Sequence, residues 1–417
     1  MTALTDTSDF ADRTRMTAGE VPFAVEELFF SRTDTRGVIL NGNEVFCRVS
    51  GFDADEIIGA PHKIVRHPDM PKAVFQLVWD RIRAGKPVGA YIKNRAKDGR
   101  YYWVYAVVSP IEGGYVSIRL KPSAKLLRVA QTLYAAQRRR ETEDGIGAEQ
   151  SLAELRMALA REGHASYATF EAEALALEMK QRCAEIGQAA DSRMDRFLAM
   201  SRAIQQVGAE TEEMMKAFEA IRTIPLNMRI LASRLENAGG PISAISVNYG
   251  SMSDEMAAWV KTFIHGDDSA FSRIRDAIVS GLFCNGISQL SSEMIRFFKE
   301  EVDGDTGEET TGELEMLSDL CDHAIDRSKV ELKKTELEAG RLSRSVLDMK
   351  RYITGLSSTR MMCKIESATL SKSGETLVGI VDQLDASQDG IEERLAKISE
   401  LNHQVQAHTA MLRASSA

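Results

Sequence analysis

The chain has 417 residues, of which 44% are hydrophobic and 27% are charged, and its formal net charge is −9 at pH 7. This length exceeds what one compact core usually holds, so we expect two or more folded units. The acidic balance argues against a nucleic-acid-binding protein. No apolar run approaches the length of a membrane-spanning helix, and the first residues are polar and acidic, unlike a signal peptide. We therefore expect a cytoplasmic chain with no membrane span.

Residues that usually mark an enzyme or a metal site are absent from the sequence. It contains no phosphate-binding loop, dinucleotide-binding glycine motif, nucleophile elbow or zinc-protease motif. The five cysteines are far apart and include no CxxC pair, so neither a structural zinc site nor a disulfide framework is expected. The short basic run at residues 138–140 is best explained as a solvated helix face. These features predict a protein that is not an enzyme and holds no metal.

Composition changes near residue 122. Most aromatic residues and most prolines precede this point, whereas Ala, Glu, Met, Leu and Arg dominate after it. Proline is poorly tolerated inside helices, so its scarcity after residue 122 favours long helices. The predicted organisation begins with a partly disordered N-terminal segment (1–22) and a sensor-sized domain (23–122). Linker helices (123–200) and a helical hairpin (201–303) follow. A short linker (304–312) then leads to a C-terminal helical region (313–417).

The first domain should mix strands and helices. Alternating apolar residues and turn signals predict five strands, at 26–31, 37–40, 88–94, 101–109 and 114–120. Short helices are expected at 43–50 and 54–57, and a longer amphipathic helix at 72–84. This order predicts an α+β domain in which helices lie on one face of a five-stranded antiparallel sheet.

The rest of the chain should be helical. Apolar residues recur at helical spacing from Ile204 to Leu235, and again from Ile242 to Val260. The two stripes flank Gly239-Gly240-Pro241, which is a stop signal followed by a fresh start. An antiparallel helical hairpin or coiled coil is predicted, whose apolar faces need a partner. A third stripe runs from Ile380 to Leu401.

Several motifs of the first domain sharpen this prediction. They include Gly51-Phe52, the run from Val65 to Lys72 (Val-Arg-His-Pro-Asp-Met-Pro-Lys), Lys97-Asp98-Gly99 and Ser117-Ile118-Arg119. This pattern resembles the PAS domain of bacterial aerotaxis receptors over about residues 23–122. In that family the domain binds FAD non-covalently and reports redox state, so the resemblance implies FAD binding here. The positions that match the family's flavin-binding residues are Asn43, Arg66, His67, Asp69, Trp79 and Asn94.

The residue types are compatible with that role, although each also has an ordinary structural explanation. Arg66 offers a planar donor fork for a pyrophosphate, and Trp79 and Asn94 suit the wall and polar edge of a flavin ring. Alternatively, Trp79 is a core residue, Asn43 is a helix cap, and residues 67–69 form a turn. Haem is the rival cofactor, with His62 or His67 as axial ligand. A PAS domain that binds nothing is the third alternative.

The helical region supports the same direction. Residues 224–247, which include Asn227, Leu231, Ala232 and Glu236, look like a degenerate form of the cytoplasmic hairpin tip of chemoreceptors. The resemblance implies a homodimer that contacts protein partners, possible ones being a chemotaxis kinase or an adaptor. The family's Arg-Ala-Gly-Glu motif is missing, which puts coupling to that kinase in doubt; an ordinary coiled coil is the alternative.

These observations predict a sensor of redox state or oxygen. A flavin held in the PAS domain would alter the packing of that domain, and the linker helices would carry the change into a dimeric helical region. The competing hypotheses are an adaptor or scaffold protein with an empty PAS domain, and a haem-based gas sensor.

Overall fold

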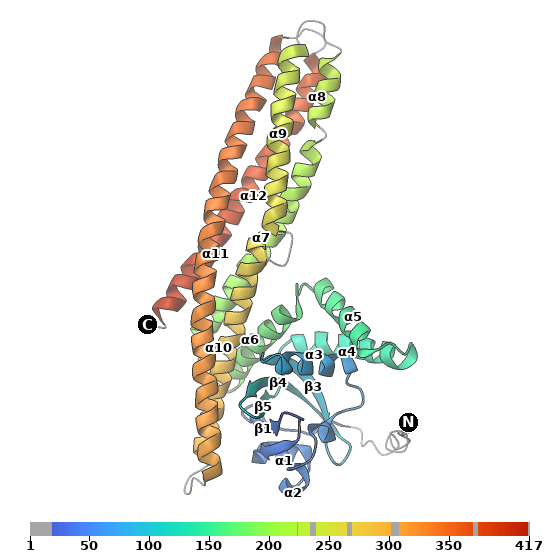
Figure 1. Cartoon of the computed structure of the whole chain (residues 1–417), viewed down its shortest axis with the longest axis vertical. Coiled ribbons are helices and arrows are strands. Elements are labelled where there is room, and N and C mark those ends of the chain that lie inside the picture. The colour runs from blue at the N-terminus through green and yellow to red at the C-terminus, as the bar shows by residue number, and fades with distance from the viewer. Residues whose placement is uncertain are drawn as a thin grey trace. The chain divides into compact units, whose positions relative to one another are not determined.

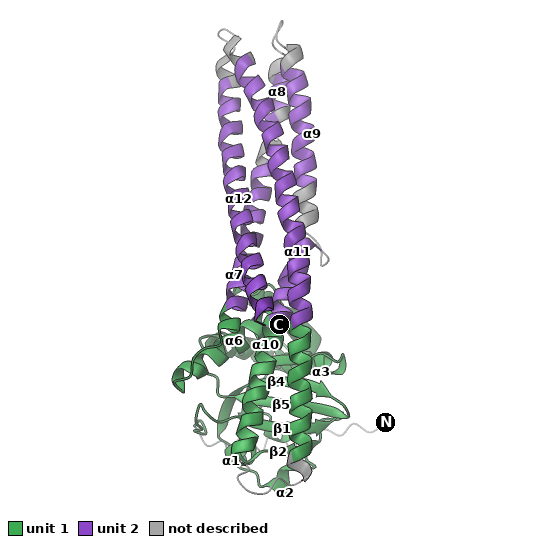
Figure 2. Ribbon diagram, turned by 90° about the vertical axis from the view of Figure 1, so that its left-hand side faces the viewer, with its two compact units in different colours: residues 1–195, 282–328 green, residues 196–281, 329–417 purple. Residues whose placement is uncertain are grey.

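The computed structural model describes residues 19–222, 224–233, 239–264, 269–301, 308–369 and 374–415. The described chain falls into two compact units, one of residues 1–195 and 282–328, the other of residues 196–281 and 329–417 (Figure 2). The helices α7, α10 and α11 contribute residues to both units. Among the described residues, none of the helices is both long and apolar enough to cross a membrane.

The first unit contains a mixed α/β domain followed by helices (Figure 1). Its strands and short helices are β1 (Phe29–Asp34), β2 (Ile39–Gly42), α1 (Glu44–Ser50), α2 (Ala54–Ile57), the 3-10 helix η2 (His62–Val65), α3 (Lys72–Arg83), β3 (Val88–Arg95), β4 (Tyr101–Ile111) and β5 (Gly114–Leu120). The helices that follow are α4 (Leu126–Glu143), α5 (Ala148–Arg161) and α6 (Tyr167–Glu185).

The five strands form one antiparallel sheet in the order β2-β1-β5-β4-β3. The two hairpins β3–β4 and β4–β5 match the predicted turns, and α3 matches the predicted amphipathic helix. The first two strands begin two or three residues later than predicted. The reason is a local turn before β1, in which the Glu27 carboxylate accepts a hydrogen bond from the Ala24 backbone N–H at 2.7 Å.

Helices cover both faces of this sheet, whereas the sequence predicted helices on one face. Alternate strand residues point to opposite faces, so Tyr91 and Tyr105 lie on the face away from α3. There Tyr91 packs against Phe170 of α6, and Phe30 of β1 packs against Phe298 of α10. Burial on both faces explains why no residue of β5 is exposed.

The second unit is helical. It comprises most of α7 (Ser192–Arg222), α8 (Ile224–Ala232), α9 (Gly239–Ile264), part of α10 (Ala270–Glu301), part of α11 (Glu308–Thr369) and α12 (Gly374–Ala414). The residues before Gly239 in the predicted turn lie outside the described residues, whereas Gly239, Gly240 and Pro241 already form the first turn of α9. Proline is tolerated there because the first helical N–H groups have no intrahelical partner.

The predicted apolar stripes are buried within the single chain. Residues of the first stripe such as Val207 and Met228, and of the second such as Tyr249, are fully buried. The Tyr249 hydroxyl accepts a hydrogen bond from Gln388 of α12 at 3.2 Å, and Arg394 of α12 pairs with Glu210 of α7 at 2.8 Å. The hairpin that the sequence left without a partner therefore packs against α12 of its own chain.

Candidate functional site

The first unit encloses a cavity of about 340 Å³ between the sheet and the helices α3 and η2. This volume falls in the range of about 300–1,000 Å³ that is typical of small-molecule sites. The side chains around it divide into an apolar helix wall, a sheet floor, a polar end and a basic rim. The lining residues used below are Ser31, Arg36, Gly37, His62, Lys63, Arg66, Phe75, Val78, Trp79, Ile82, Ala90, Ile92, Asn94, Tyr115, Ser117 and Arg119.

One face of α3 forms the apolar wall. Phe75, Val78, Trp79 and Ile82 are spaced three, four and seven residues apart, which places them on the same side of the helix. The Trp79 ring is held at its far edge by Gly37, where an added Cβ would lie 2.9 Å from the ring. Gly37 also has a φ of +83°, so both its backbone conformation and the space beside it favour glycine.

The sheet supplies the floor of the cavity. Ala90, Ile92 and Asn94 alternate along β3 and face the cavity together with Ser117 and Arg119 of β5. Asn94 is brought beside η2 by a backbone bridge to Arg66. Small and polar side chains on the floor therefore face the aromatic wall on α3, an arrangement that suits a flat ligand with one polar edge.

The polar end of the cavity is built around Arg119, which is 3% exposed. One terminal nitrogen, Nη2, lies 2.7 Å from Ser31 Oγ and 2.5 Å from His62 Nε2, while Nη1 is buried without a hydrogen-bond partner. Burial lowers the pKa of Arg119 to about 10. Burial and the neighbouring guanidinium lower the pKa of His62 to about 3, so this imidazole is neutral and its Nε2 accepts a hydrogen bond from Arg119 Nη2.

The rim of the cavity is basic. Arg36, Lys63 and Arg66 line it, and the Arg66 guanidinium stacks over the Phe75 ring at 3.8 Å from the centroid. The pKa of Arg66 is lowered mainly by burial and to a lesser extent by the positive charge of the nearby Arg138. Arg36 is largely exposed and pairs with Asp34 at 3.1 Å. Three cationic side chains at one opening can attract a phosphate-bearing ligand.

The six residues predicted for the site divide into two groups in the structure. Arg66, Trp79 and Asn94 line the cavity together. Asn43 instead caps α1, because its Oδ1 accepts from the N–H groups of Phe30 and Phe46 and its Nδ2 donates to the Leu28 carbonyl. The structure thus brings three of the six to one cavity and gives Asn43 a complete set of backbone partners.

His67 and Asp69 also lie outside the cavity lining. His67 is buried, and its Nδ1 accepts a hydrogen bond from the Asp69 backbone N–H at 3.1 Å. The Asp69 carboxylate is exposed and pairs with Lys93 at 2.7 Å. Their direct contacts are those of the turn that precedes α3.

Sequence reasoning did not assign several residues to the cavity. Ser31 was not singled out, Ser117 and Arg119 were noted only as part of a motif of the resemblance, and His62 was considered only as a haem ligand. The available signal was strand periodicity, because Tyr115, Ser117 and Arg119 alternate along β5 and must share one face. What the sequence could not indicate is that a charged guanidinium would be buried on that face.

Three buried glutamates lie on α4 and α6, the helices that follow the sheet, and they form hydrogen bonds with α3 and β3, which line the cavity. The Glu141 carboxylate of α4 accepts hydrogen bonds from the N–H groups of Lys72 and Ala73, at 2.8 and 3.1 Å, and so caps α3. Its charge also favours this helix N-terminus. One end of the helix that carries Trp79 is therefore fixed by α4.

Glu171 and Glu178 of α6 hold α3 and β3. Glu171 accepts from Arg81 Nη2 at 2.7 Å and from the Gly89 N–H at 2.9 Å. Glu178 accepts from the Tyr91 hydroxyl at 2.7 Å and from the N–H groups of Ser123 and Ala124. Burial raises the pKa of Glu171 to about 7. Helix α6 is thus tied both to the sheet floor and to the beginning of the linker.

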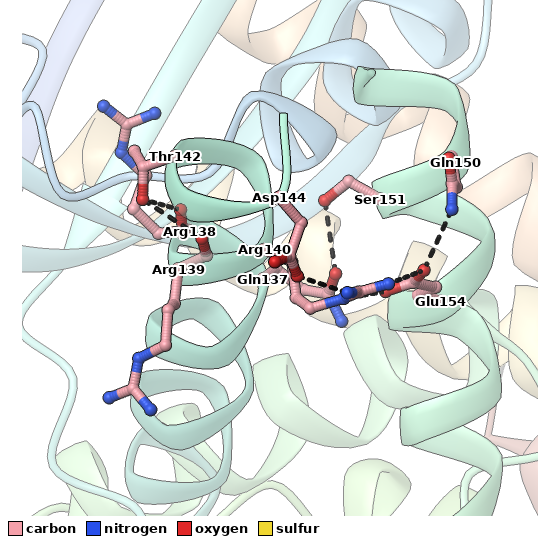
Figure 3. A network of polar contacts seen from close by, with 9 residues as sticks. All are labelled: Gln137, Arg138, Arg139, Arg140, Thr142, Asp144, Gln150, Ser151 and Glu154. Atoms are coloured by element: carbon pink, nitrogen blue, oxygen red, sulfur yellow. Dashed lines mark hydrogen bonds and ion pairs between the residues drawn. The ribbon is translucent and has the colours of Figure 1, made fainter. Parts of the chain in front are cut away.

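The basic run at residues 138–140 lies on α4, and Arg140 makes most of its contacts (Figure 3). Arg140 bonds to Glu154 of α5 at 3.0 and 3.2 Å and also pairs with Asp144. These ion pairs raise the pKa of Arg140. Arg138 lies 3.7 Å from Glu141. The run joins α4 to α5 and supports the Glu141 cap, in keeping with its predicted place on a helix surface.

Comparison with known proteins identifies the class of the first domain. Residues 39–118 match the family model described as the PAS fold. The chain therefore contains a PAS domain, whose five-stranded sheet and flanking helices are followed by a long helical region.

Curated relatives match over a limited part of the chain. The aerotaxis receptor of Escherichia coli (strain K12) is 39% identical over 126 residues, which cover 29% of this chain and 25% of the receptor. The biofilm dispersion protein BdlA of Pseudomonas aeruginosa is 29% identical over 82 residues, or 19% of this chain and 20% of that protein. The matches thus span about a quarter or less of these relatives.

A solved structure of the blue-light photoreceptor Aureochrome1 LOV is also similar. It is 22% identical and covers 25% of this chain and 88% of its own, with a TM-score of 0.23.

Proposed function

We propose that this protein is a sensor in which the PAS cavity binds a flavin, specifically FAD, and reports its redox state to the helical region. The observation that carries the proposal is the cavity itself: an aromatic wall, a basic rim and a buried guanidinium with a free N–H share one enclosed space. The relationship of this PAS domain to that of an aerotaxis receptor supports the same function.

The chemistry of the lining residues fits a flavin. The apolar space between Trp79 and the sheet residues Ala90 and Ile92 suits a flat ring. Asn94 and Arg119 offer donors to the polar edge of such a ring. Arg66 and Lys63 at the rim suit the phosphates of FAD, because a guanidinium fork and an ammonium both bind phosphate oxygens.

A bound flavin would supply a ring whose charge and hydrogen-bonding capacity change when it takes up electrons. The residues of this chain would then respond. Arg119 Nη2 contacts both His62 and Ser31, at 2.5 and 2.7 Å. If the ring bonded more strongly to Nη1 after reduction, the guanidinium would move, and its hydrogen bonds to His62 and Ser31 would change in strength.

The response would leave the cavity through α3 and β3. Trp79 and Ile82 face the cavity from α3, while Glu141 and Glu171 hold the two ends of that helix. A small displacement of α3 must therefore strain or break hydrogen bonds with α4 and α6. We propose that this converts the ligand state into a change between discrete packings of the helices, because packed interfaces do not deform continuously.

The helical region would pass the signal to a protein partner, as in chemotaxis or aerotaxis pathways, and the chain would act in the cytoplasm without catalysing a reaction. A homodimer remains part of the proposal. The buried stripes are already covered within one chain, so dimerisation would use other surfaces.

Haem is the second candidate ligand, and the geometry favours it less. His62 is the histidine that lines the cavity, but its Nε2 lies 2.5 Å from Arg119 Nη2. A haem iron would have to displace this guanidinium before the imidazole could bind it. His67, the other candidate, uses Nδ1 to accept from a backbone N–H and does not line the cavity.

The absorption spectrum of the purified full-length chain tests the proposal. We expect flavin bands, one FAD released per chain on denaturation, and loss of the bands in Arg66→Ala and Trp79→Ala. Asp69→Ala serves as the matched control, because Asp69 is exposed and outside the lining. A haem spectrum, or a chain that stays colourless after incubation with FAD, would contradict the proposal; a colourless chain would point to an adaptor.

A further inference from the structure

The guanidinium of Arg119 is a buried cation without an anionic partner. Among the described residues, no carboxylate forms an ion pair with it. Its other close neighbours are Ser31 Oγ, the neutral imidazole of His62 and the face of the Phe46 ring, whose centroid lies 5.0 Å away. Removing a charge from water without a counter-charge is costly, so such groups usually have a specific partner.

The free donor of this cation is fixed rather than mobile. Ser31 and His62 both accept from Nη2, which holds the plane of the guanidinium and leaves Nη1 as the buried nitrogen without a partner. Ser117 lies two residues earlier on the same face of β5, and its Oγ is also buried without a partner. Both residues line the cavity. Two residues of one cavity lining thus each carry an unsatisfied polar atom, and a ligand that reached these atoms would satisfy them.

We propose that Arg119 binds the polar edge of the flavin ring and preferentially stabilises the reduced, negatively charged form of that ring. This inference rests on the proposed function and extends it by assigning a redox-selective residue. Ser117 supplies the second hydrogen bond, and His62 and Ser31 position the guanidinium. The rim cations Arg36, Lys63 and Arg66 serve the phosphates instead, whose charge does not change with redox state.

The charge balance determines the selectivity. An external two-electron donor gives the ring two electrons, and the ring takes one proton from water, so the neutral oxidised ring becomes an anion with one negative charge. In the oxidised form Arg119 gains one neutral hydrogen-bond acceptor, whereas in the reduced form it gains a counter-charge in a water-poor site. The hydrogen bond of the guanidinium is charge-assisted in both forms, but the attraction between two opposite charges, which is strong in a low-dielectric site, exists only with the reduced ring. Arg119 should therefore bind the reduced ring more tightly.

The test compares the affinity of the full-length chain for oxidised FAD with its affinity for FAD reduced anaerobically by dithionite. For Arg119→Gln we expect the ratio of reduced to oxidised affinity to fall at least about tenfold, equivalent to a midpoint potential about 30 mV more negative for a two-electron couple. Arg119→Lys keeps the charge and should retain most of the ratio. Arg36→Gln is the matched control and should weaken both affinities equally.

The outcomes separate this inference from the proposed function. A wild-type chain that binds no flavin contradicts the proposed function. A flavin-bound Arg119→Gln variant with the wild-type ratio overturns the role of Arg119 and leaves the proposed function intact. Should Arg119→Gln fail to fold, Ser31→Ala is measured instead, because it removes one hydrogen bond that fixes the guanidinium. A fall of less than tenfold in the ratio of reduced to oxidised affinity supports the inference. An unchanged ratio overturns it.

Discussion

The carboxylate of Glu171 lies 2.7 Å from Arg81 Nη2, and its second oxygen accepts the Gly89 N–H at 2.9 Å. A single side chain of α6 therefore joins the end of α3 to the beginning of β3, the helix and strand that form the wall and floor of the cavity. Glu141 caps the other end of the same helix. This arrangement gives the cavity a direct physical connection to the helices that follow the PAS domain.

Replacing Glu171 should weaken this connection. For Glu171→Ala we expect a loss of about 1–3 kcal/mol in the free energy of unfolding, because two buried donors lose their acceptor. The loss should stay below that of a fully buried ion pair, since the Arg81 side chain is 30% exposed. Urea denaturation followed by near-ultraviolet circular dichroism measures it. Glu185→Ala on the same helix is the control, because Glu185 is exposed; an equal loss there would contradict a specific role for Glu171.

The elevated pKa of Glu171 also predicts an effect of pH. Burial raises this pKa from 4.5 to about 7, so the folded state binds the proton more tightly than the unfolded state does. Its contribution to stability is therefore complete below pH 4.5 and is lost as the pH rises through 7. In Glu171→Gln, which does not titrate, the free energy of unfolding should rise more steeply between pH 5 and pH 7 than in the wild type. A slope identical to that of the wild type would contradict the raised pKa.

His67 should produce the opposite dependence. Burial, with a further effect of Lys93, lowers its pKa from 6.5 to about 4, so protonation favours the unfolded state. Its contribution is present above pH 6.5 and is lost as the pH falls toward 4. In His67→Asn the amide oxygen can still accept from the Asp69 N–H. We expect this variant to lose about 1–3 kcal/mol less than the wild type between pH 7 and pH 4.5 in urea denaturation. An unchanged loss would mean that His67 is charged in the folded protein.

A side chain at Gly37 should strain the backbone and also disturb Trp79 in the cavity wall. An alanine there must adopt a φ of +83° and place its Cβ 2.9 Å from the Trp79 ring. We expect Gly37→Ala to lose about 1–3 kcal/mol of stability and to alter Trp79 fluorescence and flavin binding. Gly113→Ala is the matched control, since its φ is +76° and nothing lies within 4 Å of the added Cβ. Comparable disturbance of flavin binding in both variants would show that strain alone is responsible.

The sequence allowed the sheet and α3 to be predicted because their signals are local. Alternation and turn residues define β3, β4 and β5, and the spacing of Val74 to Ile82 defines the helix. Arg66, Trp79 and Asn94 were predicted as site residues from the resemblance, and their role in flavin binding stays a prediction. They are the three predicted residues that line the cavity.

The remaining parts of the site depend on contacts that sequence patterns do not reveal. Glu141, Glu171 and Glu178 lie on helices rich in charge, where a glutamate normally faces solvent, and only tertiary packing buries them. The second sheet face is covered by α6 and α10 through contacts between residues far apart in the chain, such as Tyr91 with Phe170 and Phe30 with Phe298. Arg119 was noted in a motif but not predicted as a site residue, because a buried and unpaired arginine is an exception to the usual pattern.

Hydrogen exchange of the full-length, flavin-bound chain, compared between its oxidised and reduced states, tests the link between cavity and helices most directly. The informative amides are those held by the three glutamates: Lys72 and Ala73, Gly89, and Ser123 and Ala124. We expect the exchange rates of these amides to change on reduction, whereas those of Gly113 and Gly99 in the hairpin turns stay constant. Identical exchange at all five amides in the two redox states would contradict the transmission of a redox signal through α3.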